Sequence, residues 1–175
     1  VVDSCGVEVL TSNLGKTVHL QVESNTADLI NELTWTDYGD WSGVPTSYDV
    51  YRSMDGVWDP TPIATGISGT TYDDPVDVLT DVSGGTFHYY VMAIEGPGNI
   101  YSISDSARSN EVVALQNPRV YVPGAFRPGS QDADVNVFYP QGNFISEKDY
   151  QFIVYNRWGS IVFESGEIYK GWDGT

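Results

Sequence analysis

The chain has 175 residues, of which 41% are apolar and 13% aromatic, and it carries 24 acidic against 8 basic side chains. This composition allows one or two packed domains and argues against disorder. A net charge of −16 repels phosphate backbones and anionic membrane surfaces, so nucleic-acid binding is not expected.

The acidic charge is concentrated in the first two thirds of the sequence. Residues 1–117 hold 17 acidic and 3 basic side chains, a net charge of −14, whereas residues 118–175 hold 7 and 5, a net charge of −2. Acidic surfaces keep extracellular domains soluble, which is the interpretation we favour. Capture of calcium is the alternative.

The sequence has no membrane-spanning or targeting signal. No apolar run approaches the roughly 18 residues needed to cross a bilayer, and the N-terminus lacks a charged stretch followed by an apolar one. Membrane insertion is therefore not expected. Because Val1–Gly6 already resembles part of a strand, we expect the chain to start inside a longer protein whose export signal lies upstream. A single cysteine, Cys5, excludes an intramolecular disulfide.

The pattern of apolar residues predicts an all-β chain without a convincing helix. Residues 1–15 are expected to be the tail of a preceding domain or a first-strand region. Seven short strands are then predicted at 17–22, 32–36, 47–52, 62–64, 70–72, 86–94 and 110–115. Seven strands within ~100 residues, separated by turns, predict an immunoglobulin-like β-sandwich.

Aromatic residues in three of these strands resemble a fibronectin type III domain, which we assign to residues 16–115. They are Trp35, the Tyr48-Asp-Val-Tyr51 segment and the Phe87–Ala93 segment. The resemblance implies that Trp35 packs across the core. Independently of it, the period of two along a strand predicts a core face made of Phe87, Tyr89, Val91 and Ala93.

Residues 116–118 are expected to be a stiff linker, because Pro118 has a fixed φ and biases Asn117 toward extended geometry. A second unit then begins at Arg119. Its expected elements are a strand at 120–122, a long turn over 125–140 that closes on Phe138, and two strands joined by a tight turn at 150–155 and 161–163.

Four motifs in this second unit resemble the type B C-terminal sorting domain of the type IX secretion system, also called the gliding-motility-associated C-terminal domain, of Bacteroidetes-type bacteria. They are Tyr121–Pro128, Tyr150–Gly159, Val162–Ser165 and Trp172–Gly174. Members of that family continue beyond Trp-Asp-Gly with two further strands. The resemblance therefore implies that residues 119–175 are a partial sorting domain, a small and incomplete β-sandwich.

The resemblance implies a non-enzymatic C-terminal region of a secreted cell-surface protein that travels through the periplasm. Its partners would be outer-membrane components of the type IX translocon. The alternative is a carbohydrate- or calcium-binding accessory module of an extracellular hydrolase or adhesin, with a glycan or an extracellular protein as partner. The candidate translocon-recognition residues are Asn156, Arg157, Trp158, Gly159, Trp172, Asp173 and Gly174.

No catalytic residue and no cofactor are expected. His19 and His88 fall inside predicted strands without an evident partner, and no Gly-x-Ser-x-Gly nucleophile motif is present. Asp132, Asp134 and Asn136 have the alternate spacing that begins a calcium loop. The downstream Gly and Glu of such a loop are missing, so turn chemistry is the favoured interpretation and calcium the weaker one.

Several aromatic and acidic residues allow two interpretations each. Trp158 could dock a partner or bind a sugar, but core packing is favoured because tryptophan is usually largely buried. Trp41 and Trp58 lie in predicted loops, where packing is favoured over sugar binding. A solvent-exposed acidic face is expected from Asp73, Asp74, Asp77 and Asp81.

Overall fold

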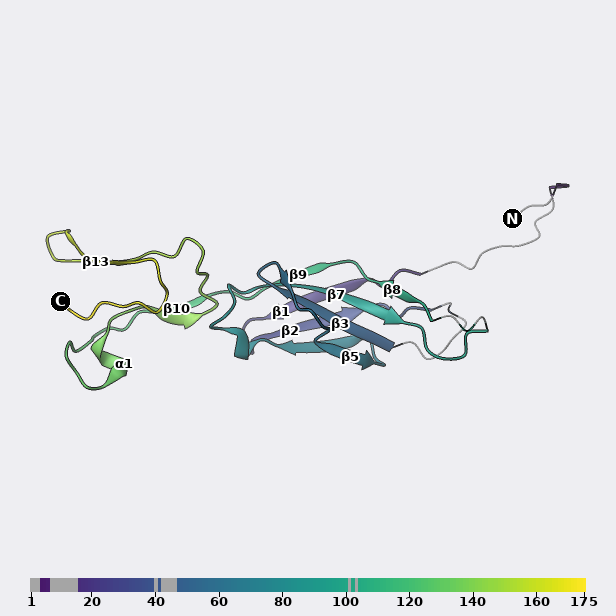
Figure 1. Cartoon of the computed structure of the whole chain (residues 1–175), viewed down its shortest axis with the longest axis horizontal. Coiled ribbons are helices and arrows are strands. Elements are labelled where there is room, and N and C mark those ends of the chain that lie inside the picture. The colour runs from purple at the N-terminus through teal and green to yellow at the C-terminus, as the bar shows by residue number, and fades with distance from the viewer. Residues whose placement is uncertain (1–3, 7–15, 40, 42–46, 101, 103) are drawn as a thin grey trace.

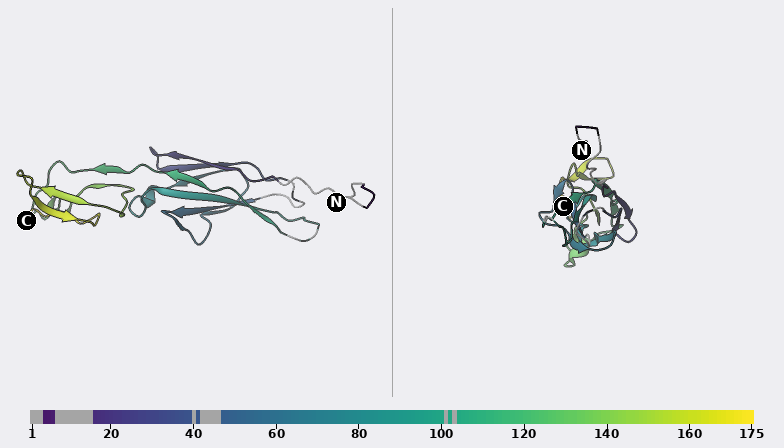
Figure 2. Two further views of the ribbon diagram at one scale, coloured as in Figure 1. Left: turned by 90° about the horizontal axis from the view of Figure 1, so that it is seen from above. Right: turned by 90° about the vertical axis from the view of Figure 1, so that its right-hand side faces the viewer.

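The computed structural model describes residues 4–6, 16–39, 41, 47–100, 102 and 104–175. Figure 1 shows two units placed end to end along the long axis: a sandwich that carries strands β1 to β9, and a smaller unit with β10 to β13. The view along this axis in Figure 2 shows how narrow the molecule is. None of the helices in the described ranges is long and apolar enough to cross a membrane.

One sheet of the sandwich has three antiparallel strands. β2 (Ile30–Trp35) lies between β1 (Leu20–Asn25) and β6 (Thr71–Pro75). Side chains along β2 alternate, with Asn31, Leu33 and Trp35 buried and Glu32 and Thr34 between them exposed. This sheet therefore has one face on the core and one in solvent.

The second sheet is built on the long antiparallel pair of β3 (Ser47–Met54) and β7 (Thr86–Ile94). Four short strands flank this pair. On the β3 side they are β4 (Val57–Trp58) and β5 (Ala64–Ile67), and on the β7 side β8 (Ser106–Arg108) and β9 (Val112–Leu115). The expected all-β, immunoglobulin-like sandwich is confirmed, and β7 has the predicted bounds.

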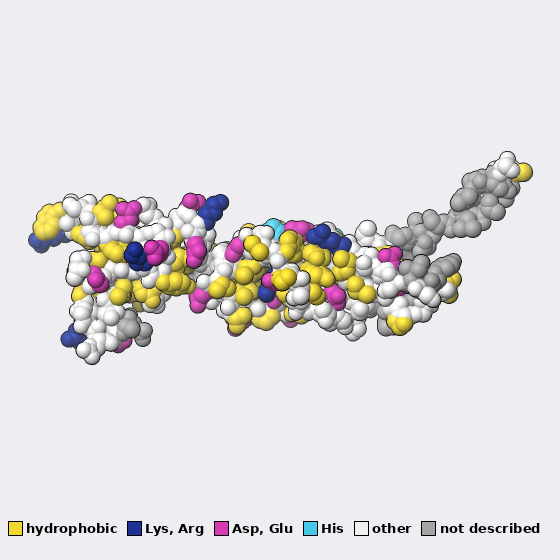
Figure 3. Space-filling model, in the orientation of Figure 1, with side chains coloured by type: hydrophobic (Ala, Val, Ile, Leu, Met, Phe, Trp, Pro, Cys, Tyr) yellow, Lys and Arg dark blue, Asp and Glu magenta, His cyan; other side chains and the backbone are white. Residues whose placement is uncertain are grey.

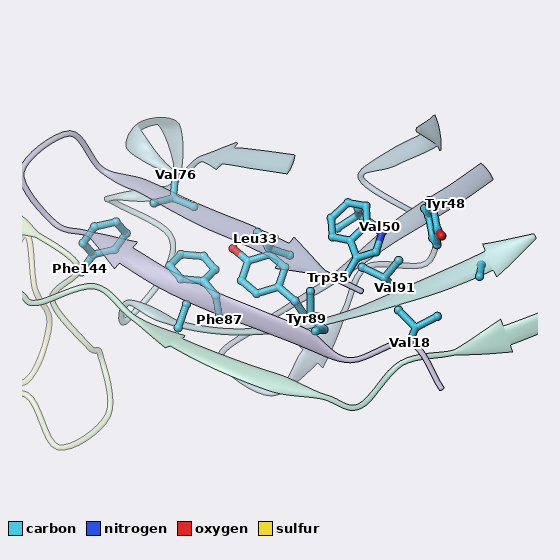
Figure 4. Close-up of a cluster of buried hydrophobic side chains, with 13 residues drawn as sticks. Val18, Leu33, Trp35, Tyr48, Val50, Val76, Phe87, Tyr89, Val91 and Phe144 are labelled. Carbon is cyan, nitrogen blue, oxygen red and sulfur yellow. The ribbon is translucent and has the colours of Figure 1, made fainter. Parts of the chain in front are cut away.

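The core between the sheets contains the side chains that alternation predicts. Phe87, Tyr89, Val91 and Ala93 are all fully buried on β7, and Figure 4 shows the first three of them in one row with Val50 and Leu33. The ring of Trp35 lies edge-on to Tyr48 at 5.4 Å between centroids. The core position expected for Trp35 is confirmed.

A buried ion pair crosses this core, which corrects the interpretation of the acidic cluster. Asp73, Asp77 and Asp81 are exposed as expected, but Asp74 is only 3% exposed. Both carboxylate oxygens of Asp74 lie 3.1 Å from Nη1 of Arg52, because β6 turns this position inward. The guanidinium and further hydrogen bonds compensate its burial.

Hydrogen bonds extend this pair through the core toward the linker. Tyr89 donates its hydroxyl hydrogen to Asp74 at 2.7 Å and accepts a bond from Asn31 Nδ2 at 2.7 Å. The Asn31 carbonyl oxygen in turn accepts from Gln116 Nε2 at 2.8 Å. A connected polar network of this kind specifies one arrangement of the two sheets.

The smaller unit consists of two two-stranded antiparallel sheets. One pairs β10 (Arg119–Tyr121) with β11 (Gln141–Asn143), and the other pairs β12 (Phe152–Tyr155) with β13 (Ile161–Ser165). β11 was not predicted from the sequence. Helical structure in the described ranges is limited to the single turns η1 (Asp77–Leu79) and α1 (Ala133–Asn136).

Candidate functional site

The turn between β12 and β13 is shaped by Asn156 and Gly159. The Asn156 side-chain oxygen accepts the N–H groups of Trp158 at 2.9 Å and Ser160 at 3.0 Å. Gly159 donates its N–H to the Asn156 carbonyl at 3.0 Å and has a φ of +80°. This is a type I turn followed by a left-handed residue, for which glycine is best suited.

Arg157 and Trp158 occupy the tip of this turn and point into solvent. The Trp158 side chain is 74% exposed, and the guanidinium carbon of Arg157 lies 4.1 Å from its ring centroid. The expectation that Trp158 packs in a core is therefore wrong. A tight turn leaves its two central side chains no strand face to pack against, so the two stack on each other instead.

The strand ends beside the tip add apolar surface. Tyr155 is 56% exposed and its directly paired partner Ile161 is 54% exposed. In Figure 3 hydrophobic and basic side chains lie together at this end of the molecule. The tip thus presents a cation and a large aromatic ring on a preformed turn, bordered by apolar side chains.

The Trp172-Asp173-Gly174 motif, by contrast, packs onto its own unit. The Trp172 main chain exchanges hydrogen bonds with Phe138 at 2.8 and 2.9 Å. A Cβ on Gly174 would lie 2.6 Å from Pro128 Cγ, and its φ is +92°. Hydrogen bonds from the Thr175 hydroxyl and N–H to the carboxylate lower the pKa of Asp173.

Five aromatic rings form a continuous row inside the smaller unit, with neighbouring centroids 5.3 to 6.0 Å apart. In order of contact they are Trp172, Phe126, Phe138, Phe152 and Phe163. All five are only half-buried. The row contains one residue from each of the four motifs that resemble the sorting domain. The recognition candidates therefore divide into an exposed tip and a packed motif that supports it.

The three candidate calcium ligands lie around the single-turn helix α1. Asp132 is exposed and Asn136 half-exposed, whereas the side chain of Asp134 lies outside the described residues. Nowhere in the described part of the chain do three or more His, Cys, Asp or Glu side chains group in a way that could hold a metal ion. Calcium binding at these residues stays a prediction.

The outer face of the β3–β7 sheet carries residues whose grouping the sequence did not reveal. Tyr51 and Tyr90 stack with 4.6 Å between ring centroids, and the guanidinium carbon of Arg108 lies 3.9 Å from the centroid of the Tyr90 ring. Trp58 belongs to β4 rather than to a loop, and its ring is 4.9 Å from Tyr90. Hydrophobic side chains cover much of the sandwich face seen in Figure 3.

His88 and Trp41 both have contact partners within the sandwich. His88 does have a partner, because its Nδ1 lies 3.0 Å from Glu111 Oε1. Trp41 is half-buried against Tyr38, with ring centroids 4.2 Å apart, which confirms loop packing for this tryptophan.

No protein-family model matches the chain, and no curated protein matches it. A solved structure described as an Fn3-like protein from Clostridium thermocellum aligns with 61% of this chain and 96% of its own, at 23% identity and a TM-score of 0.41. At this low similarity, the assignment of the first unit to the immunoglobulin-like sandwich rests on the strand order described above.

Proposed function

We propose that this chain is a non-enzymatic region of a secreted bacterial cell-surface protein. In this proposal the sandwich is a spacer, and residues 119–175 carry a signal for translocation across the outer membrane by the type IX system. The observation that carries the proposal is the solvent-exposed pair of Arg157 and Trp158 at the tip of the β12–β13 hairpin.

The tip has the properties of a protein-recognition element. Tryptophan and arginine are the side chains most enriched at positions that dominate binding energy. The turn beneath them is fixed by two backbone N–H groups that donate to the side-chain oxygen of Asn156, so little conformational freedom is lost on binding. Trp172 and Gly174 would contribute indirectly, by holding the unit together.

The test is export of a reporter fused to the sandwich and the intact C-terminal sorting domain in a type IX-competent host. We expect the wild-type fusion at the cell surface and Trp158→Ala in the periplasm. Trp58→Ala is the matched control, since it removes a partly exposed tryptophan from the sandwich and should leave export unchanged. Normal export of Trp158→Ala, or retention of the wild-type fusion in the periplasm, would contradict the proposal.

A glycan-binding accessory module is the second candidate, supported by the aromatic cluster of Trp58, Tyr51 and Tyr90 on the outer face of the sandwich. It is supported less well, because Tyr51 and Arg108 already stack on the Tyr90 ring. A glycan array separates the two candidates: binding that Trp58→Ala abolishes favours the module, and absence of binding removes it.

A further inference from the structure

Phe144 belongs to the smaller unit by sequence but lies in the core of the sandwich. It directly follows β11, yet its side chain is 1% exposed. Its ring meets Phe87 of β7 edge-on, with 6.0 Å between centroids. Figure 4 shows Phe144 at one end of the row of core side chains, beyond Phe87 and near Val76. The smaller unit therefore supplies an aromatic side chain that closes one end of the sandwich.

The backbone at this contact is adapted to the insertion. The Phe144 N–H donates to the Thr80 carbonyl at 2.8 Å, and its φ of +55° is a conformation that bulky residues rarely adopt. A Cβ on Gly85 would lie 2.5 Å from the Gln116 carbonyl oxygen and 3.1 Å from Phe144 Cβ. An unusual backbone conformation persists only where surrounding contacts determine it, and these contacts do so here.

Two polar contacts attach the linker region to other points of the sandwich. The buried side chain of Gln116 donates to the carbonyl of Ile30 at 3.3 Å, in addition to its bond to Asn31. Arg119 Nη2 donates to the carbonyl of Thr26 at 2.7 Å. With Phe144, these contacts fix the smaller unit at three separate points, which opposes free rotation about the linker.

Beside Phe144 the two units are separated by a cleft of about 810 Å³. Asp55, Asp81 and His88 line it from the sandwich, and Ser146, Glu147 and Lys148 line it from the smaller unit. Val82 and Ile145 add one apolar side chain from each unit to the lining, but Phe144 is the fully buried aromatic side chain that crosses the joint. Loss of this one side chain should therefore weaken the attachment of the smaller unit, even though the Gln116 and Arg119 contacts remain.

We propose that Phe144 completes the core of the sandwich and positions the smaller unit on it, so that the two fold as one cooperative block. The smaller unit needs this support, because two-stranded sheets are marginally stable by themselves and its aromatic row is only half-buried. Docking would also hold the Arg157–Trp158 tip at a set position relative to the sandwich. This last consequence rests on the proposed function, whereas the docking itself does not.

The test is hydrogen exchange in the full-length chain, followed separately in β7 and in β12. Loss of a fully buried phenylalanine should raise exchange about 100-fold or more in the slowest β7 amides. We expect Phe144→Ala to do this in β7 and to raise exchange in β12 as well. Tyr121→Ala is the matched control: it removes a 63% exposed aromatic ring from the smaller unit, so it should leave exchange in β7 and β12 unchanged.

Phe144→Leu keeps an apolar side chain in the core and should give β7 exchange between the wild type and Phe144→Ala. If Phe144→Ala does not fold at all, β7 exchange in Phe144→Leu tests the docking in its place. Wild-type exchange in β7 of Phe144→Ala, or an equal effect of Tyr121→Ala on β7, would overturn the docking. Export of Trp158→Ala tests the sorting signal, and hydrogen exchange in Phe144→Ala tests the docking. The two proposals can therefore fail separately.

Discussion

Replacement of Arg52 by methionine tests whether the ion pair with Asp74 stabilises the sandwich from within. The side chains of Arg52 and Asp74 are 15% and 5% exposed. Methionine keeps much of the apolar length of arginine but leaves the Asp74 carboxylate with the Tyr89 hydroxyl as its side-chain donor, at 2.7 Å. Asp59, 3.3 Å from Arg52, loses its partner as well.

The expected loss follows from this burial. Removal of one partner from a buried ion pair costs about 3–5 kcal/mol, because the remaining charge stays buried without compensation. The whole free energy of unfolding of a domain is about 5–15 kcal/mol. Arg52→Met should therefore remove a large part of the stability, which urea unfolding at neutral pH measures directly.

Arg108→Met is the matched control in the same sheet. Arg108 lies 3.5 Å from Glu111 with both side chains about half exposed, and exposed pairs contribute about 0–1 kcal/mol. Its contact with Tyr90 adds about 0.5–1 kcal/mol. If Arg52→Met costs no more than Arg108→Met, the buried pair does not stabilise the sandwich and the reasoning fails.

Two further outcomes test other parts of the structure. Burial and the hydrogen bond to Asp37 raise the pKa of Tyr48 to about 12; a raised pKa favours the neutral folded form, so stability should fall as pH rises from about 10 toward 12. In Tyr48→Phe, the free energy of unfolding measured with urea should fall less steeply between about pH 9 and 11. An unchanged dependence on pH would refute the role given to Tyr48. A Cβ on Gly142 would collide with the Arg119 carbonyl, whereas Gly124 has open space around it. Gly142→Ala should therefore cost about 1–3 kcal/mol and Gly124→Ala much less, and equal unfolding midpoints for the two would show that the β10–β11 pairing tolerates a side chain.

Strands that pair over many residues could be predicted from the sequence. β7 alternates between large apolar side chains and others over nine residues, and a period of two needs no knowledge of the partner strand. β8 and β11 have three residues each, Ser-Ala-Arg and Gln-Gly-Asn. They carry no such pattern, because their strand geometry comes from the partner with which they pair.

Contacts between distant parts of the chain could not be predicted in the same way. Asp74 has the same local appearance as its exposed acidic neighbours, and its burial depends on Arg52, which is 22 positions away. Trp158 is exposed because it lies at the tip of a tight turn, although tryptophan is usually largely buried. Phe144 and Ile145 form an apolar pair between polar residues without periodicity, and only the folded molecule shows the opening that the Phe144 ring closes.

Because the two units lie end to end, the two ends of the molecule differ in net charge. The part of the chain that forms the sandwich and precedes it carries a net charge of −14, and the part that forms the smaller unit carries −2. Near a negatively charged surface, the sandwich end is repelled more strongly, and this torque turns the smaller unit toward the surface. The torque weakens beyond about 8 Å at physiological ionic strength, so added salt randomises the orientation without any change of conformation.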